Sequence, residues 1–143
     1  MKENSTNKQL IILVGPPGSG KTTYCHNELP TYLRISQDDM GKEGHMKEFL
    51  DAIQKGKPKI VVDRVNHIRK HRQRYIEPAQ GYGYRVKVIS LRVGYEECLK
   101  RCLGRVLEHA TIKDEATARA AIGSFFASYE DILASECDQV MFI

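Results

Sequence analysis

The sequence has no tryptophan, only four cysteines and five prolines among 143 residues, and no long apolar run. The cysteines (Cys25, Cys98, Cys102 and Cys137) include no Cys-x-x-Cys pair, which argues against a zinc site or a disulfide framework. No apolar run approaches the roughly 18 residues that a membrane span needs, and the polar start Met1–Asn7 lacks the apolar core of a signal peptide. We therefore expect a cytoplasmic protein with reduced thiols and no membrane partner.

The composition is that of an ordinary globular protein. At 41% hydrophobic and 28% charged residues, the chain is unlike disordered or fibrous proteins. Its length suits one domain, so we expect a flexible tail over residues 1–7 and a single domain over residues 8–143. The net charge of +4 is a mild lean towards anionic partners.

Apolar patterning alternates between strands and helices along the whole chain, which is typical of a parallel sheet covered by helices. The pattern predicts strands at Gln9–Val14, Tyr32–Ser36, Lys59–Asp63, Tyr84–Leu91 and Gln139–Ile143. It predicts helices at Lys21–Leu29, Met46–Gln54, His67–Ala79, Glu96–His109 and Asp114–Ala134. The expected architecture is a three-layer α/β fold with a five-stranded parallel sheet and a helical lid at about residues 96–113.

A glycine-rich turn follows the first predicted strand. The segment Gly15–Thr22 satisfies G-x-x-x-x-G-K-[ST], the P-loop of the P-loop NTPase fold. Glycines let backbone N–H groups wrap the phosphates, Lys21 bridges them and the Thr22 hydroxyl is placed to hold Mg²⁺. A dinucleotide-binding loop has no need of a Lys-Thr pair, so a nucleoside triphosphate is the expected ligand. The predicted nucleotide-binding residues are Gly15, Pro16, Pro17, Gly18, Ser19, Gly20, Lys21, Thr22 and Thr23.

Acidic residues follow the second and third predicted strands. Asp38 and Asp39 should lie beside the P-loop, where a carboxylate can take the proton of an attacking hydroxyl; the alternative is that one of them caps the next helix. Asp63 ends the third strand, a usual place for an acid that binds Mg²⁺ directly or through water. A structural pair with a nearby arginine is its alternative role.

Two arginines lie four residues apart in the predicted lid helix. Arg101 and Arg105 share one face, which points away from the core leucines. They would either be solvated or neutralise charge on a transferring phosphoryl group, an effect worth roughly 10³ to 10⁵ in rate for an arginine finger. Gly104, between them, would loosen the helix.

The segment Arg64–Arg74 is the most basic part of the chain, with five Lys or Arg and two His among eleven residues. A solvated helix face is the ordinary explanation of such a run. Its density also suits a surface that follows nucleic-acid phosphates, with Tyr75, Tyr82 and Tyr84 nearby as either stacking or core residues.

These motifs together resemble the kinase domain of the phage-type 5′-polynucleotide kinases, and of related kinase modules in nucleic-acid repair and tRNA-ligase enzymes. The resemblance rests on GPPGSGKTT, ISQDD, VVDRVN and KRCLGR, in this order. It implies that Asp38 activates a 5′-hydroxyl, that Lys21 and Thr22 hold the donor and Mg²⁺, and that Arg101 and Arg105 act from the lid. Asp63 and Asn66 match an element near the acceptor or the metal.

The sequence departs from that family at two acceptor-side positions, because Gly41 and Gln37 stand where arginines occur. There is also no D-x-D-x-T phosphatase motif. The departures concern the acceptor and leave the donor site intact.

The sequence thus predicts a kinase that transfers the γ-phosphate of ATP or GTP, with Mg²⁺, to the 5′-hydroxyl of a single-stranded or end-bearing DNA or RNA. A kinase for a nucleoside, sugar or other metabolite is the alternative enzyme, and a nucleotide-binding module with little turnover is the alternative from another class. The predicted substrate-binding residues are Asp38, Asp39, Arg64, Asn66, Arg69 and Arg72. The choice of nucleotide and the oligomeric state stay open.

Overall fold

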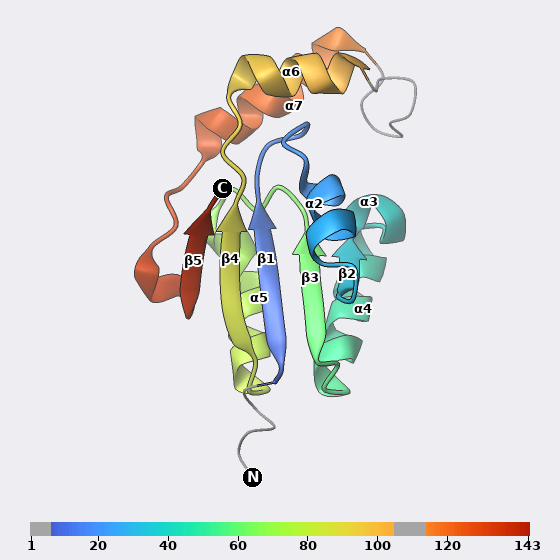
Figure 1. Ribbon diagram of the computed structural model, residues 1–143, viewed down its shortest axis with the longest axis vertical. Coiled ribbons are helices and arrows are strands. Elements are labelled where there is room, and N and C mark those ends of the chain that lie inside the picture. Colours follow the sequence, from blue (N-terminus) through green and yellow to red (C-terminus); the bar gives the residue numbers. More distant parts are fainter. Residues whose placement is uncertain (1–6, 105–113) are drawn as a thin grey trace.

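One parallel sheet organises the chain (Figure 1). The computed structural model describes residues 7–104 and 114–143. Its strands are β1 (Gln9–Val14), β2 (Leu33–Ser36), β3 (Lys59–Asp63), β4 (Arg85–Ser90) and β5 (Gln139–Phe142). They lie in the order β2-β3-β1-β4-β5, every pair parallel. The predicted five-stranded parallel sheet is confirmed.

Helices cover both faces of the sheet and its carboxyl end. They are α2 (Lys21–Glu28), α3 (Gln37–Met40), α4 (Lys42–Gln54), α5 (Arg69–Gly81), α6 (Tyr95–Gly104), α7 (Glu115–Ser128) and the short 3₁₀ helix η2 (Ala134–Glu136). In Figure 1, α2 lies in front of the sheet, α4 and α5 lie behind it, and α6 and α7 cross above the ends of the strands.

The central strand β1 is buried on both faces, as its continuous apolar run predicts. Leu10 and Ile12 point into the core under α4 and α5, whereas Ile11 and Leu13 point into the smaller core under α2. This double burial fixes the strand's end, and therefore the loop that follows it, on a rigid base. In the part of the chain that the structure describes, no helix has the length and apolar character needed to cross a bilayer.

The end of α7 differs from the sequence prediction. The apolar repeat predicts a helix to Ala134, but α7 ends at Ser128 and an extended segment follows. The guanidinium of Arg72 donates hydrogen bonds to the carbonyl oxygens of Glu130 and Asp131. Because those carbonyls are bound from outside the helix, tertiary contacts override the local pattern here.

Two other helix boundaries concern the site. The helix predicted from Met46 already begins at Lys42, since His45 is buried and joins the inner face. The lid helix α6 packs against α7 through Cys98, Leu99 and Cys102. The remainder of the predicted lid, residues 105–113, lies outside the described residues.

Candidate functional site

The P-loop, residues 15–20, joins β1 to α2 with two glycines in the left-handed region. Gly18 has φ 84° and Gly20 has φ 94°, a conformation that L side chains rarely adopt. A Cβ atom at Gly18 would also lie 2.6 Å from the carbonyl oxygen of Cys98 and 2.9 Å from Cys102 Sγ. The lid helix α6 therefore rests directly on the loop, and glycine is required at this contact.

The ammonium group of Lys21 is held inside the loop. Its Nζ donates to the carbonyl oxygens of Gly15 and Pro16, both at 3.0 Å. Burial lowers the pKa of Lys21, while the nearby charge of Asp63 acts in the opposite direction. A buried cation needs an anionic partner, so this loop is suited to bind phosphate.

The hydroxyl of Ser19 gives a second sign of an anion site. Its Oγ is buried, and it has no hydrogen-bond partner among the described residues. Buried hydroxyls are usually hydrogen-bonded, so a ligand oxygen would complete it. Pro16 is buried and Pro17 half-buried at the turn of the loop.

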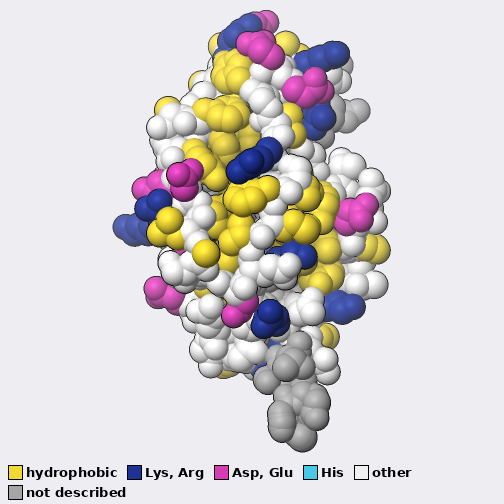
Figure 2. All heavy atoms as spheres, turned by 60° about the vertical axis from the view of Figure 1, so that its left-hand side comes forward, with side chains coloured by type: hydrophobic (Ala, Val, Ile, Leu, Met, Phe, Trp, Pro, Cys, Tyr) yellow, Lys and Arg dark blue, Asp and Glu magenta, His cyan; other side chains and the backbone are white. Residues whose placement is uncertain are grey.

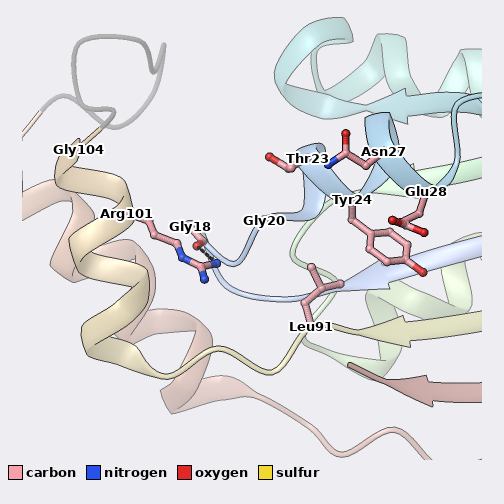
Figure 3. Close-up of a pocket in the computed structure, with 9 residues that line it drawn as sticks. All are labelled: Gly18, Gly20, Thr23, Tyr24, Asn27, Glu28, Leu91, Arg101 and Gly104. Atoms are coloured by element: carbon pink, nitrogen blue, oxygen red, sulfur yellow. Dashed lines mark hydrogen bonds between the residues drawn. The ribbon is translucent and has the colours of Figure 1, made fainter.

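A cavity of about 630 Å³ opens between the P-loop, α2 and α6 (Figure 3). Its lining includes Thr23, Tyr24, Asn27 and Glu28 from α2. The volume falls within the roughly 300–1,000 Å³ of small-molecule sites. The cavity is large enough for a nucleoside beside the P-loop, and the Tyr24 ring, the Asn27 amide and the Glu28 carboxylate line it.

Thr22 and Asp63 meet at the other side of the loop. The Thr22 hydroxyl donates to Asp63 Oδ2 at 2.9 Å, and the Asp63 side chain is buried at the end of β3. Hydroxyl and carboxylate oxygens are ligands that Mg²⁺ accepts, usually completed by substrate phosphates. The two predicted metal residues are therefore adjacent and have suitable chemistry, and no cluster of three or more His, Cys, Asp or Glu side chains suited to a metal occurs within residues 7–104 and 114–143.

Arg34 on β2 is a site residue that the sequence interpretation missed. Its Nε donates to Asp63 Oδ2 at 2.8 Å, and its Nη1 lies 2.6 Å from Asp39 Oδ2. Its Nη2 is 3.4 Å from Thr22 Oγ1. The available signal was a charged side chain between the apolar Leu33 and Ile35 of a short strand.

Arg34 also distinguishes the two acids of α3. Asp39 is bound by this guanidinium, whereas Asp38 is exposed and makes no hydrogen bond or ion pair with any described residue. Asp38 nonetheless lies near enough to Lys21 for its charge to oppose, in small part, the lowering of that lysine's pKa by burial. The structure thus leaves Asp38 available to a ligand beside the loop and holds Asp39 in place.

Arg101 reaches the P-loop from α6. Its Nη1 donates to the carbonyl oxygen of Gly18 at 3.4 Å, and its Nε to Glu97 at 3.0 Å; Figure 3 shows the side chain pointing at the loop. Arg101 therefore brings a cation from α6 to the P-loop. Arg105, predicted to act with it, lies outside the described residues.

The segment after β3 is largely committed to internal contacts. Arg64 donates to the Tyr75 hydroxyl at 2.8 Å. Asn66 is buried with φ 47° and donates to the carbonyl oxygen of Leu13 at 2.8 Å, which fastens this segment to β1. The Asn66 Oδ1 atom has no partner among the described residues.

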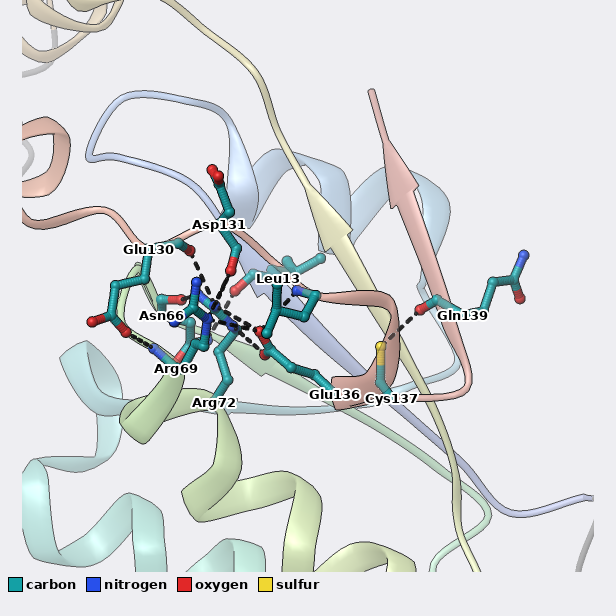
Figure 4. Close-up of polar contacts among 10 residues, drawn as sticks. Leu13, Asn66, Arg69, Arg72, Glu130, Asp131, Glu136, Cys137 and Gln139 are labelled. Atoms are coloured by element: carbon teal, nitrogen blue, oxygen red, sulfur yellow. Dashed lines mark hydrogen bonds and ion pairs between the residues drawn. The ribbon is translucent and has the colours of Figure 1, made fainter.

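Arg72 corrects the picture of a solvated basic helix face (Figure 4). Its side chain is fully buried, and its Nε lies 2.8 Å from Glu136 Oε1. Arg72 is therefore not accessible to a substrate, and the prediction that it binds the acceptor is wrong. Arg69 is 42% exposed, although its Nε donates to the carbonyl oxygen of Asp131. The candidate stacking rings Tyr75 and Tyr84 belong to the core.

A family model and two longer proteins are similar in sequence to this chain. A family model described as an AAA domain matches residues 10–48. The transcription factor bHLH140 of Arabidopsis thaliana is 29% identical over 134 residues, covering 86% of this chain and 14% of that protein. The bifunctional polynucleotide phosphatase/kinase of Schizosaccharomyces pombe is 28% identical over 110 residues, covering 75% and 27%. The chain thus spans about a quarter or less of these relatives.

Solved structures share the fold at low identity. A chain of the Pnkp1/Rnl/Hen1 RNA repair complex has TM-score 0.69 at 20% identity, covering 86% of this chain and 45% of that one. Kti12 of Chaetomium thermophilum in complex with ADP-AlF3 has TM-score 0.64 at 18%, covering 94% and 88%. A gluconokinase from Sinorhizobium meliloti has TM-score 0.60 at 14%, covering 96% and 83%. The chain therefore shares its parallel α/β fold with these structures.

Proposed function

We propose that this protein is a phosphotransferase that moves the γ-phosphate of ATP to a hydroxyl group, most favourably the 5′-hydroxyl of a polynucleotide. The observation that carries the proposal is the arrangement around the P-loop. Lys21 and the Thr22–Asp63 pair would hold the donor, and Asp38 stands beside them with no hydrogen-bond partner among residues 7–104 and 114–143. This set supplies phosphate binding, a metal site and a base.

The donor nucleotide is expected to enter between α2 and α6. The loop N–H groups, Lys21 and the Ser19 hydroxyl would bind its phosphates, with the nucleoside in the 630 Å³ cavity. Arg101 already lies at the Gly18 carbonyl, from which it can turn to a phosphate oxygen. The similarity to a structure solved with ADP-AlF3 supports an adenine nucleotide over the GTP alternative.

The residues Thr22 and Asp63 would hold Mg²⁺, which when bound neutralises phosphate charge. Asp38 accepts the proton of the attacking hydroxyl as the new P–O bond forms on the side opposite the leaving ADP oxygen. An exposed carboxylate with no internal hydrogen bond has its lone pairs free for that proton. Asp39, held by Arg34, is assigned a positioning role instead.

A polynucleotide acceptor is supported by two observations. One relative is a polynucleotide phosphatase/kinase, and one structural neighbour belongs to an RNA repair complex. The exposed basic side chains of Lys70 and Arg74 and the half-exposed Arg69 remain available for phosphates.

A kinase for a small metabolite is the second candidate. It is favoured by the burial of Arg72, which removes one cation from the predicted acceptor surface, and by Gly41, which replaces an acceptor arginine. The gluconokinase similarity shows that the fold is compatible with a metabolite acceptor.

Transfer of labelled γ-phosphate from ATP and Mg²⁺ to a 5′-hydroxyl oligonucleotide tests the proposal, with Lys21→Ala as the control. We expect label on wild-type product and none with the variant. Acceptor affinity should fall steeply with salt for a polynucleotide, by tens of fold for several phosphate contacts. Transfer only to neutral metabolites, without salt dependence, would favour the second candidate.

A further inference from the structure

A second cleft, of about 360 Å³, opens on the α7 side of the P-loop. Pro16 of the loop, Ser90 at the end of β4, and Phe125, Phe126 and Tyr129 of the α7 region all line it. The cavity of about 630 Å³ proposed for the donor and this cleft share Leu91, the first residue after β4. A phosphotransferase needs two ligand sites at one phosphate loop, and the donor occupies the first.

The rings that line the cleft differ in how much of them a ligand can reach. Phe125 is nearly buried, because it packs into the core and the His67 ring stacks on it at 5.5 Å between centroids. Phe126 is 44% exposed, and Tyr129 is half-buried. An aromatic ring left this open beside a phosphate site is suited to stack on another planar ring.

The cleft lies within reach of the reacting groups. Asp38 follows β2 and Ser90 ends β4, with β3 and β1 between these two strands. Three inter-strand spacings separate the strand ends by about 14 Å, and the Asp38 carboxylate covers part of that distance, because its charge reaches Lys21 of the loop. An acceptor whose hydroxyl meets Asp38 can therefore extend over the loop into this cleft.

Charged side chains at the cleft also suit a nucleotide. Arg92 lines it and is exposed, with its guanidinium 4.1 Å from the centroid of the Phe142 ring. Asp131 lines it too and supplies an acceptor for a base amino group. Arg69 donates a hydrogen bond from its Nε to the Asp131 carbonyl oxygen at 3.1 Å. A second cation is therefore bonded to a residue that lines the cleft. Figure 2 shows apolar side chains gathered on the β4 and β5 side, with a basic side chain among them.

We propose that this cleft binds the terminal base of a polynucleotide acceptor by stacking on Phe126, with Tyr129 beside it. The inference rests on the proposed function and makes it more specific, because a sugar acceptor has no planar ring to stack. Stacking tolerates any base, so the cleft selects for a nucleoside end without selecting its sequence.

Fluorescence of an oligonucleotide with 2-aminopurine at its 5′ end tests the stacking without phosphotransfer. We expect wild-type protein to quench it, and Phe126→Ala and Phe126→Leu to lose the quench; Phe126→Leu keeps an apolar side chain and removes only the ring. Tyr82→Ala removes a ring of nearly equal exposure (45%) that follows the end of α5 and precedes β4, whereas Ser90 of the cleft ends that strand. This variant should quench like wild type. A quench that survives Phe126→Ala overturns the proposal.

Kinetics provide the second test. Phe126→Ala should lower kcat/KM for an oligonucleotide acceptor about 5- to 100-fold, the range that base–aromatic stacking gives, with ATP affinity unchanged. An acceptor with an abasic 5′ residue should lose a similar factor with wild type and nothing more with Phe126→Ala. If the abasic acceptor and the Phe126→Ala variant instead lower kcat/KM independently, so that the two factors multiply, stacking on Phe126 is contradicted. A quench without any phosphotransfer would support the cleft and overturn the proposed function, whereas transfer without quench would do the reverse.

Discussion

The guanidinium of Arg34 binds the carboxylate of Asp63, with Nε 2.8 Å from Oδ2. The same oxygen accepts a hydrogen bond from Thr22, so one carboxylate oxygen ties β2 and β3 to the first turn of α2. Through its second contact, to Asp39, Arg34 connects the proposed metal-binding residues with the proposed acceptor-binding residues.

Removing Arg34 should therefore impair turnover more than folding. Partners that orient metal-binding groups typically contribute 10- to 100-fold to metal affinity or activity, so we expect Arg34→Met to lower kcat by about this factor. Arg34→Lys should recover part of it, because it restores a cation without the planar fork. Arg85→Met, at an exposed arginine at the start of β4, is the control. Phosphotransfer by Arg34→Met within twofold of wild type would argue against this role.

Substituting Gly18 should disturb the seat of the lid helix. Gly18→Ala places a Cβ atom 2.6 Å from a backbone oxygen of α6 in a residue with φ 84°, so the loop or α6 must move. We expect nucleotide affinity to fall more than tenfold and the melting temperature to drop. Gly123→Ala is the matched control in α7, where nothing lies within 4 Å of the added methyl; it should stabilise by about 0.4–1 kcal/mol. Titration calorimetry and thermal melts measure both effects, and equal nucleotide affinity in the two variants would contradict the contact.

The Arg72–Glu136 pair should stabilise the fold and not the substrate complex. Arg72→Met removes the nearer of the two cations at the buried Glu136 carboxylate and leaves Arg69 at 3.5 Å. Breaking a buried pair typically costs about 3–5 kcal/mol of unfolding free energy, and we expect a loss towards the lower end of this range. Arg72→Met/Glu136→Leu should recover part of that loss; full recovery is not expected, because Arg72 also binds three backbone carbonyls. Urea denaturation provides the values. A stable Arg72→Met with weakened oligonucleotide binding would restore Arg72 to the acceptor surface.

Stability should fall in mildly acidic solution. Burial lowers the pKa of His45, whose ring is fully enclosed and bonded to Tyr75; burial likewise lowers the pKa of His67. The unfolded chain binds protons at these histidines more readily than the folded chain, so their contribution is complete above pH about 6.5 and is lost as pH falls below it. Melting temperatures from pH 7.5 to 5.5 should show this slope, and His45→Phe should flatten it while His26→Phe, at an exposed histidine, should not. A slope unchanged by His45→Phe would contradict the assignment.

The apolar pattern of the sequence was sufficient to predict the five-stranded parallel sheet, because a strand buried on both faces, such as β1, has an unbroken run of apolar residues. The same pattern did not predict the end of α7, where Arg72 binds the carbonyl oxygens of the residues that follow the helix. The P-loop could be predicted from the sequence because its chemistry requires particular residue types at a fixed spacing. The role of Arg34 could not be predicted, because it depends on a neighbouring strand and the local sequence does not give the order of the strands.

The basic segment after β3 also could not be interpreted from the sequence alone. Charge density in a sequence does not tell which arginines are solvated and which are paired inside. Arg72 meets Glu136 across 64 residues of chain, a contact that no local pattern announces. Phe126 is the converse case, because it is a large apolar side chain in α7 that the structure leaves 44% exposed.

The central claim is that Asp38 is the base and Asp39 is not, and kinetics of the two asparagine variants test it most directly. Both should bind ATP like wild type. Asp38→Asn should lower kcat by about 10²- to 10⁴-fold, the usual contribution of a general base, whereas Asp39→Asn should lower it less than tenfold. Turnover that survives Asp38→Asn, or that collapses only in Asp39→Asn, would contradict the account.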